Sequence, residues 1–176
     1  AILSGLVGSE MCIRDRAYDK LGNYNMAITE FEAALRLAPN YFYALSNLGN
    51  VYGKKKEYAR SILYTKKALQ QKIDYAPGHY NLAKAFHMTG NTKKAMESYE
   101  AAIQYNPYFE EAFFNLGFLA LELKQLKKSV DNFKKFLKIK IAQKKNLMQV
   151  LKRDLYRRRL ERRYYYSHFQ RPYIYI

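Results

Sequence analysis

Apolar and small side chains recur along this chain at fixed intervals, and the longest of these intervals is 34 residues. The triplet Asn-Leu-(Gly/Ala) marks it, at Asn47-Leu48-Gly49, Asn81-Leu82-Ala83 and Asn115-Leu116-Gly117. A constant interval of this size indicates a stacked array of one supersecondary unit. Fold and function therefore have to be predicted repeat by repeat.

Other positions of the unit keep the same step. In each complete copy a small residue stands 13 positions after the Leu, and the residue four positions further on is large, except at Thr65. The small residues, with that of an earlier partial copy first, are Ala27, Ser61, Ala95 and Ser129. The large residues are Phe31, Tyr99 and Phe133, and two copies close on Pro39 and Pro107.

This order of residues resembles the tetratricopeptide repeat, a 34-residue helix-turn-helix with the signature Leu-Gly-x-x-Tyr, Ala-x-x-x-Phe and Pro. The resemblance covers residues 17–141 and implies an all-α fold, a right-handed superhelix of antiparallel helix pairs (an α-solenoid). Thr65 departs from the signature where an aromatic is expected, and Phe136 departs where Ala is expected. We expect Phe136 to push its neighbour away or to face something other than a fifth repeat.

The repeat frame predicts where the helices lie. Residues 17–40 form a partial first repeat that keeps its second helix, and complete repeats follow at 41–74, 75–108 and 109–141. First helices are expected at 41–54, 76–89 and 108–123, and second helices at 24–38, 57–72, 91–105 and 125–140. Gly22 and Gly90 suit the left-handed turns between paired helices, whereas Lys56 and Lys124 are expected to give weaker turns.

The two ends of the chain do not fit the repeat. Residues 5–16 resemble a translated transposase adapter from DNA sequencing libraries, so we expect residues 1–16 to be non-native; a diverged helix is the alternative. Residues 142–163 carry Leu147, Leu151 and Leu155 at helical spacing and predict a separate basic helix that caps the last repeat. Residues 164–176 have no helical period and are expected to be disordered or a spurious read-through.

Charge is concentrated in this C-terminal region. The chain has a formal net charge of +16, and residues 138–176 hold 12 Lys or Arg against 2 Asp or Glu. No apolar run approaches the roughly 20 residues that span a bilayer, so no membrane span is expected. The single cysteine, Cys12, lies in the suspect segment, and the chain does not begin with Met. The compartment therefore stays open, with the cytoplasm as the default.

The resemblance places the first helix of each repeat along a concave groove. Residues that share one face of each helix are expected to line it: Tyr43, Asn47, Asn50, Tyr80, Asn81, Lys84, Phe114, Asn115 and Phe118. Asn47, Asn81 and Asn115 form a ladder of carboxamides about one helix diameter apart, roughly 10 Å. An extended peptide covers that distance in about three residues, so the ladder suits capture of a peptide backbone. The alternative is that each Asn only pairs locally.

The ladder predicts a non-catalytic scaffold that binds an extended segment of a partner protein. It is similar to the groove of the O-linked N-acetylglucosamine transferase, so a fragment of a larger repeat-containing enzyme, such as a glycosyltransferase, is one alternative. The sequence offers no phosphate-cradling loop, nucleophile triad, metal site or cofactor site. His79 and His87 lie eight residues apart, about 12 Å along a helix, too far to share a metal ion.

Binding of RNA or another polyanion is the second alternative. The cations that would carry it are interleaved with Tyr156 and Tyr164: Lys152, Arg153, Arg157, Arg158, Arg159, Arg162 and Arg163. The sequence does not predict an oligomeric state.

Overall fold

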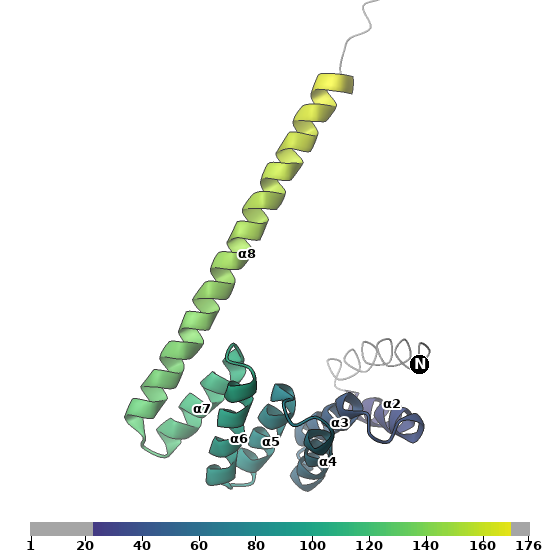
Figure 1. The fold of residues 1–176 in the computed structure, drawn as a ribbon, viewed down its shortest axis with the longest axis vertical. Helices are drawn as coiled ribbons and strands as arrows, with labels where there is room; N and C mark the ends of the chain where they lie inside the picture. Colours follow the sequence, from purple (N-terminus) through teal and green to yellow (C-terminus); the bar gives the residue numbers. More distant parts are fainter. Residues whose placement is uncertain (1–22, 170–176) are drawn as a thin grey trace, which may run out of the picture.

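The computed structural model describes residues 23–169, and the side chains of residues 23–161. Within that range the chain is seven helices without a strand, arranged in a row from which the last helix projects (Figure 1). The helices are α2 (Tyr24–Leu37), α3 (Phe42–Lys54), α4 (Tyr58–Gln71), α5 (Ala76–Met88), α6 (Thr92–Tyr105), α7 (Glu110–Glu122) and α8 (Leu126–Phe169). The all-α solenoid expected from the sequence is confirmed.

Helices α2 to α7 begin and end within two residues of the predicted positions, and local chemistry explains several of their ends. The side chains of Asn23 and Asn91 cap α2 and α6 by accepting hydrogen bonds from the amides of Met26 and Lys94, each 3.4 Å long. Pro77 stands in the first turn of α5, where its missing N–H is not needed.

Paired helices α3–α4, α5–α6 and α7–α8 pack as hairpins, and each hairpin stacks on the next through α4–α5 and α6–α7. Small side chains of the second helices lie fully buried, including Ala27, Ala68, Ala95 and Ala102, which lets neighbouring helices approach closely. Larger side chains fill the space between repeats in two clusters. One is built around Phe31, Leu48, Val51 and Tyr52, and the other around Leu82, Phe86, Tyr99, Leu116 and Leu119.

Each described turn between paired helices uses a left-handed residue, as predicted for Gly90, while Gly22 lies outside the described residues. Gly90 has a φ of 76°, while Lys56 and Lys124 adopt φ values of 64° and 59° in spite of their side chains. The residue after each turn donates an amide hydrogen bond back into the helix, for example Gln125 to the carbonyl of Ala120 at 2.8 Å. The two lysines therefore hold a conformation that costs an L-residue free energy and glycine almost none.

Replacing Lys124 with Gly is expected to raise the free energy of unfolding by about 0.5–1 kcal/mol, because relief of the left-handed strain exceeds the added entropy of the unfolded chain. Urea denaturation followed by circular dichroism measures it. Gly90→Lys is the matched reverse change and should lower stability by a comparable amount. A Lys124→Gly variant that is less stable than the parent would contradict this account of the turn.

The C-terminal end corrects the sequence prediction. Helix α8 continues without a break from the last repeat to Phe169, a length of about 66 Å, and no separate helix begins at residue 142. Ile139 is the last half-buried side chain, Lys140 pairs with Glu110, and every residue from 141 to 161 is exposed. The helix therefore leaves the body instead of capping it (Figure 1).

The physical reason is the absence of a helix stop. Neither Gly nor Pro occurs between Gly117 and Pro172, and Ile141 occupies the place that Pro107 takes in the preceding repeat. The helix also runs past residue 163 into the segment expected to be disordered or spurious. The predictions for residues 1–16 and for residues 170–176 lie outside the described residues.

Candidate functional site

The nine predicted groove residues lie on three successive first helices: α3, α5 and α7. Tyr43, Phe114 and Phe118 are 40%, 41% and 48% exposed. The other six are half-buried: Asn47, Asn50, Tyr80, Asn81, Lys84 and Asn115. The structure divides them among three neighbouring environments: a polar hollow, an inter-repeat hydrogen-bond row and an aromatic end cluster.

The polar hollow is a depression of about 220 Å³ between α3 and α5. Asn50, Asn81 and Lys84 line it together with Lys54, and Met88 adds an apolar wall. Carboxamides and ammonium groups supply hydrogen-bond donors, and the carboxamides also supply acceptors. The hollow can therefore accept backbone carbonyls or a carboxylate of a bound segment.

The inter-repeat hydrogen-bond row joins neighbouring first helices. The Asn81 carboxamide donates to the Ser46 hydroxyl at 3.4 Å, and the Asn115 carboxamide donates to the Tyr80 hydroxyl at 2.8 Å. Each bond spans 35 residues in sequence, so each Asn reaches the residue just before the Asn of the preceding repeat. Asn81 and Asn115 are thus each paired with another side chain of the protein itself, as the alternative to peptide binding supposes.

These bonds do not exhaust the chemistry of the amides. A carboxamide has two N–H donors and one carbonyl acceptor, and each of these two bonds uses one donor. Burial raises the pKa of the Tyr80 phenol, and the hydrogen bond from Asn115 partly offsets that shift, while the charge of Glu111 adds to it. Tyr80 therefore stays a neutral hydroxyl that accepts from Asn115.

The aromatic end cluster consists of Phe114 and Phe118 on α7 with Phe133 and Phe136 on α8. The Phe114 ring lies 5.8 Å from that of Phe133 and 5.2 Å from that of Phe136, centroid to centroid. Phe136 replaces the Ala that closes the other hairpins, and its ring meets Phe114 instead of an additional repeat. The cluster is only half covered, because the projecting part of α8 turns away from it (Figure 1).

Tyr43 belongs to a different aromatic group at the start of α3. Its ring lies 4.0 Å from Phe42 and 5.4 Å, edge-on, from Tyr75 of the next repeat. These contacts fix the ring while 40% of the residue remains exposed. The three aromatic groove residues on α3 and α7, Tyr43, Phe114 and Phe118, are thus held in place by contacts within the protein.

The two described histidines have structural partners. His79 is buried, bonds the carbonyl of Ile73 at 2.7 Å and stacks on Tyr105. His87 contacts Glu122 of the next repeat at 2.8 Å. Among residues 23–161 the structure forms no group of three or more His, Cys, Asp or Glu that could hold a metal ion.

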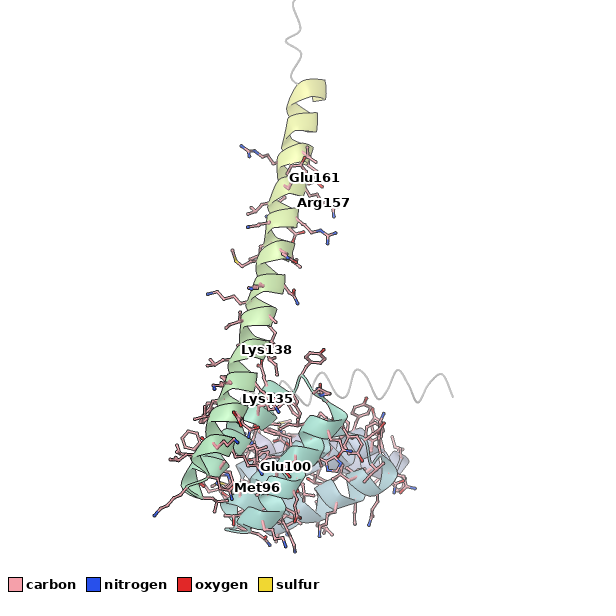
Figure 2. All side chains as sticks on the ribbon, turned by 60° about the vertical axis from the view of Figure 1, so that its left-hand side comes forward. Met96, Glu100, Lys135, Lys138, Arg157 and Glu161 are labelled. Atoms are coloured by element: carbon pink, nitrogen blue, oxygen red, sulfur yellow. The ribbon has the colours of Figure 1, made fainter. Side chains whose placement is uncertain are left out.

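Sequence reasoning missed the contacts that tie the base of α8 to α6. The Lys128 ammonium donates to the Glu100 carboxylate at 2.6 Å and touches the sulfur of Met96 (Figure 2 shows these two residues beside α8). Further along α8 the basic residues from Lys152 to Arg159 are exposed, and Arg157 pairs with Glu161 at 3.0 Å (Figure 2). The side chains of Arg162 and Arg163 are outside the described set. None of the described helices is both long and apolar enough to cross a membrane.

Comparison with known families agrees with the repeat frame. Residues 16–56 match a family described as TPR repeat, and residues 76–109 and 110–140 match families described as Tetratricopeptide repeat. Together the three matches cover more than half of the chain. The scaffold architecture of the described helices is that of this repeat class, which is consistent with protein–protein interaction.

The curated relatives are much longer than this chain. It is 28% identical over 127 residues to the anaphase-promoting complex subunit CDC16 of Saccharomyces cerevisiae, which covers 68% of this chain and 15% of that protein. It is 44% identical over 64 residues to the protein CTR9 homolog of Arabidopsis thaliana, or 34% of this chain and 6% of that protein. The chain therefore spans less than a fifth of the length of either relative.

Solved structures of similar shape include a MamA RS-1 ArsTM double mutant, with a TM-score of 0.67 and 25% identity over 76% of this chain and 75% of the other. An O-GlcNAc transferase mutant from Thermobaculum terrenum matches with a TM-score of 0.64 and 19% identity, over 66% of this chain and 22% of that enzyme. The second similarity shows the fold alone.

Proposed function

The chain belongs to the tetratricopeptide repeat family, and from that premise we propose that its first helices bind an extended segment of a partner protein without catalysis. The observation that carries the proposal is the continuity of the surface. The polar hollow lies between α3 and α5, and the aromatic end cluster follows on α7. Polar groups would hold the backbone of the segment, and the exposed rings of Phe114 and Phe118 would hold apolar side chains.

Two further observations support a scaffold. Two of the relatives are named as subunits of the anaphase-promoting complex, and a subunit functions by contacting other chains. The groove side chains are also held in fixed positions by contacts between repeats, as the bonds of Asn81 and Asn115 show. A fixed surface loses less conformational entropy on binding than a mobile one.

Replacing Asn47, Asn81 and Asn115 together with Ala is expected to weaken capture of an extended peptide at least tenfold. The physical reason is the loss of three groups that pair with a peptide backbone, each contributing about 0.5–1.5 kcal/mol. The probe is the tightest-binding 12-residue peptide selected from a displayed random library on the unchanged protein, and fluorescence anisotropy measures its affinity.

A matched control separates binding from stability. Ser46→Ala removes the inter-repeat hydrogen bond of Asn81 from the hydroxyl side, at a residue outside the nine groove residues, and leaves all three amides in place. We expect this control to lose stability but to keep peptide affinity within about twofold, which is under 0.5 kcal/mol. Equal losses in both variants, or no loss in the triple variant, would refute the role of the amides.

A further inference from the structure

The projecting part of α8 carries an apolar seam with coiled-coil spacing. From the last turn that contacts the body onward, large apolar residues follow one another on one side of the helix at Leu137, Ile141, Met148, Leu151 and Leu155. With Lys144 and Arg158 included, successive seam positions are separated by 4, 3, 4, 3, 4 and 3 residues. Alternating steps of three and four are the a and d positions of a heptad repeat, the spacing with which two helices pack along each other.

The seam has no partner within the described residues. Its five apolar side chains are between 47% and 67% exposed, over a stretch where every residue from 141 to 161 is exposed. Large contiguous apolar surface is unusual on a chain in water and marks a contact with another molecule. The seam also starts where α8 leaves the aromatic end cluster, so the two apolar surfaces are continuous along one helix.

The charges beside the seam indicate which kind of partner would bind to it. A row of cations runs beside the seam at seven-residue intervals: Lys138, Lys145, Lys152 and Arg159. This is the e position of the same heptad, the position whose charge selects the partner helix. The other flank, the g position, contains one cation and two acidic residues, in the order Lys140, Leu147, Asp154 and Glu161. The seam thus fits a helix whose own flank is acidic.

We propose that residues 137–159 of α8 form a docking seam for an acidic amphipathic helix of another protein, which packs along α8 as a two-stranded coiled coil. This seam is a second interaction surface, separate from the peptide groove on α3, α5 and α7. Glu or Asp residues of the partner would pair with the cation row, and its apolar residues would cover Met148, Leu151 and Leu155.

A second copy of this chain fits less well. In a parallel pair Lys144 and Arg158 would each face their own counterpart across the seam, where like charges repel at close range. In an antiparallel pair the two rows of cations would lie against each other. An acidic partner removes both conflicts, because it brings no cation to face Lys144 and Arg158, and both long side chains can reach the carboxylates on its flanks.

RNA fits less well for a different reason. Phosphate contacts need cations but gain nothing from a row of aliphatic side chains, and only aromatic or guanidinium groups stack on bases. Leu151 and Leu155 would remain uncovered on an RNA complex. Substitution of the aliphatic seam residues should therefore weaken the binding of a helix but not of RNA, so an experiment can distinguish the two partners.

The probe is a synthetic peptide of four heptads with Leu at a and d and Glu at e and g, titrated against the whole chain by isothermal calorimetry. We expect it to bind at least tenfold more tightly than the same peptide with Lys at e and g. Leu151→Gln with Leu155→Gln should weaken binding at least tenfold. Gln preserves helix propensity, so circular dichroism should show unchanged helicity.

Matched controls lie on the same helix away from the seam. Val150→Gln with Leu160→Gln removes two apolar residues that are 52% and 48% exposed, and should change affinity less than twofold. Lys152→Glu reverses a charge in the cation row and should weaken binding about fivefold, whereas the neighbouring Arg153→Glu reverses the same charge off the seam and should have little effect.

Three results would overturn the proposal. The first is equal binding of the Glu and Lys peptides, or equal loss in the seam and control variants. The second is tighter binding to a 20-nucleotide single-stranded RNA, or to phosphatidylserine vesicles, than to the Glu peptide, with equal weakening by Lys152→Glu and Arg153→Glu. The third is a dimer of the chain in analytical ultracentrifugation that the Leu151→Gln and Leu155→Gln changes dissociate.

Discussion

Replacing Gly49 with Ala is expected to lower the free energy of unfolding by about 2 kcal/mol and the midpoint of thermal unfolding by about 6 °C. Gly49 lies where α3 crosses α4, and a Cβ added there would overlap the hydroxyl oxygen of Thr65 and lie 3.1 Å from the carbonyl oxygen of Ser61. Both neighbours are buried, so neither the helix backbone nor the Thr65 side chain can move into free space. The cost of overpacking exceeds the roughly 1 kcal/mol that Ala gains over Gly in a helix.

Calorimetry on two companion variants isolates this cause. Gly53→Ala adds the same methyl group one turn later, where the nearest atom is the Ser61 hydroxyl oxygen at 3.2 Å, and should be nearly neutral. Thr65→Ala removes the overlapping hydroxyl, so Gly49→Ala should cost at least 1 kcal/mol less in that background than alone. A Gly49→Ala protein as stable as its parent would show that the two helices do not approach this closely.

The sequence marks Thr65 as a departure from the repeat signature, and the packing shows what it meets. The equivalent pairs in the next two repeats are Ala83 with Tyr99 and Gly117 with Phe133. At Gly117 the atoms nearest an added Cβ belong to the Phe133 ring, whereas at Gly49 the backbone carbonyl of Ser61 on the partner helix is also close. The Thr65 hydroxyl finds no hydrogen-bond partner within the described chain.

Most of the repeat body could be predicted because the same packing recurs in three successive repeats. A position that must be small at a helix crossing is small in every copy, so helix limits and turn residues follow from the interval alone. The left-handed turns at Lys56 and Lys124 illustrate this, since their place in the frame predicted a conformation that their residue type disfavours. The frame also predicted which helices carry the groove.

The candidate groove could be predicted only in outline. The interval placed Asn81 and Asn115 on first helices, but it does not report contacts between helices of different repeats. A usable signal was present, because Ser46 and Tyr80, both hydroxyl-bearing, stand directly before Asn47 and Asn81. In the last repeat Phe114 takes that position, so the hydrogen-bond row ends there and the aromatic end cluster begins.

The C-terminal helix was predicted wrongly because apolar spacing shows which face of a helix is buried but not what buries it. Leu147, Leu151 and Leu155 were assigned to the body of this chain, whereas the unbroken backbone after Ile139 carries them away from it. The missing Gly or Pro near residue 141 was the stronger signal. A helix folds back on its own repeat only where the chain can turn.

Raising the pH from 10 to 12 is expected to remove about 2–3 kcal/mol of stability through one buried phenol, that of Tyr99. Burial raises the pKa of Tyr99 far above its usual value near 10, and the neighbouring Tyr80 and Glu122 add to the shift. Above pH 10 the unfolded chain loses this proton while the folded chain keeps it. The stabilising contribution is therefore complete below pH 10 and disappears as the pH rises towards the pKa of the folded state.

The slope of stability against pH identifies the residue responsible. Tyr99 is 1% exposed, so Tyr99→Phe should preserve the packed ring and reduce the loss above pH 10 by about 1.4 kcal/mol per pH unit, the value for one proton. Urea denaturation at several pH values measures the slope.

Tyr108→Phe is the matched control, because that ring is 77% exposed and meets water in both states. Lysines also lose charge in this range, but both variants retain them all, so only the difference between the two slopes reports the buried phenol. Equal slopes would mean that Tyr99 reaches solvent, and the close packing of α5, α6 and α7 around its ring would have to be abandoned.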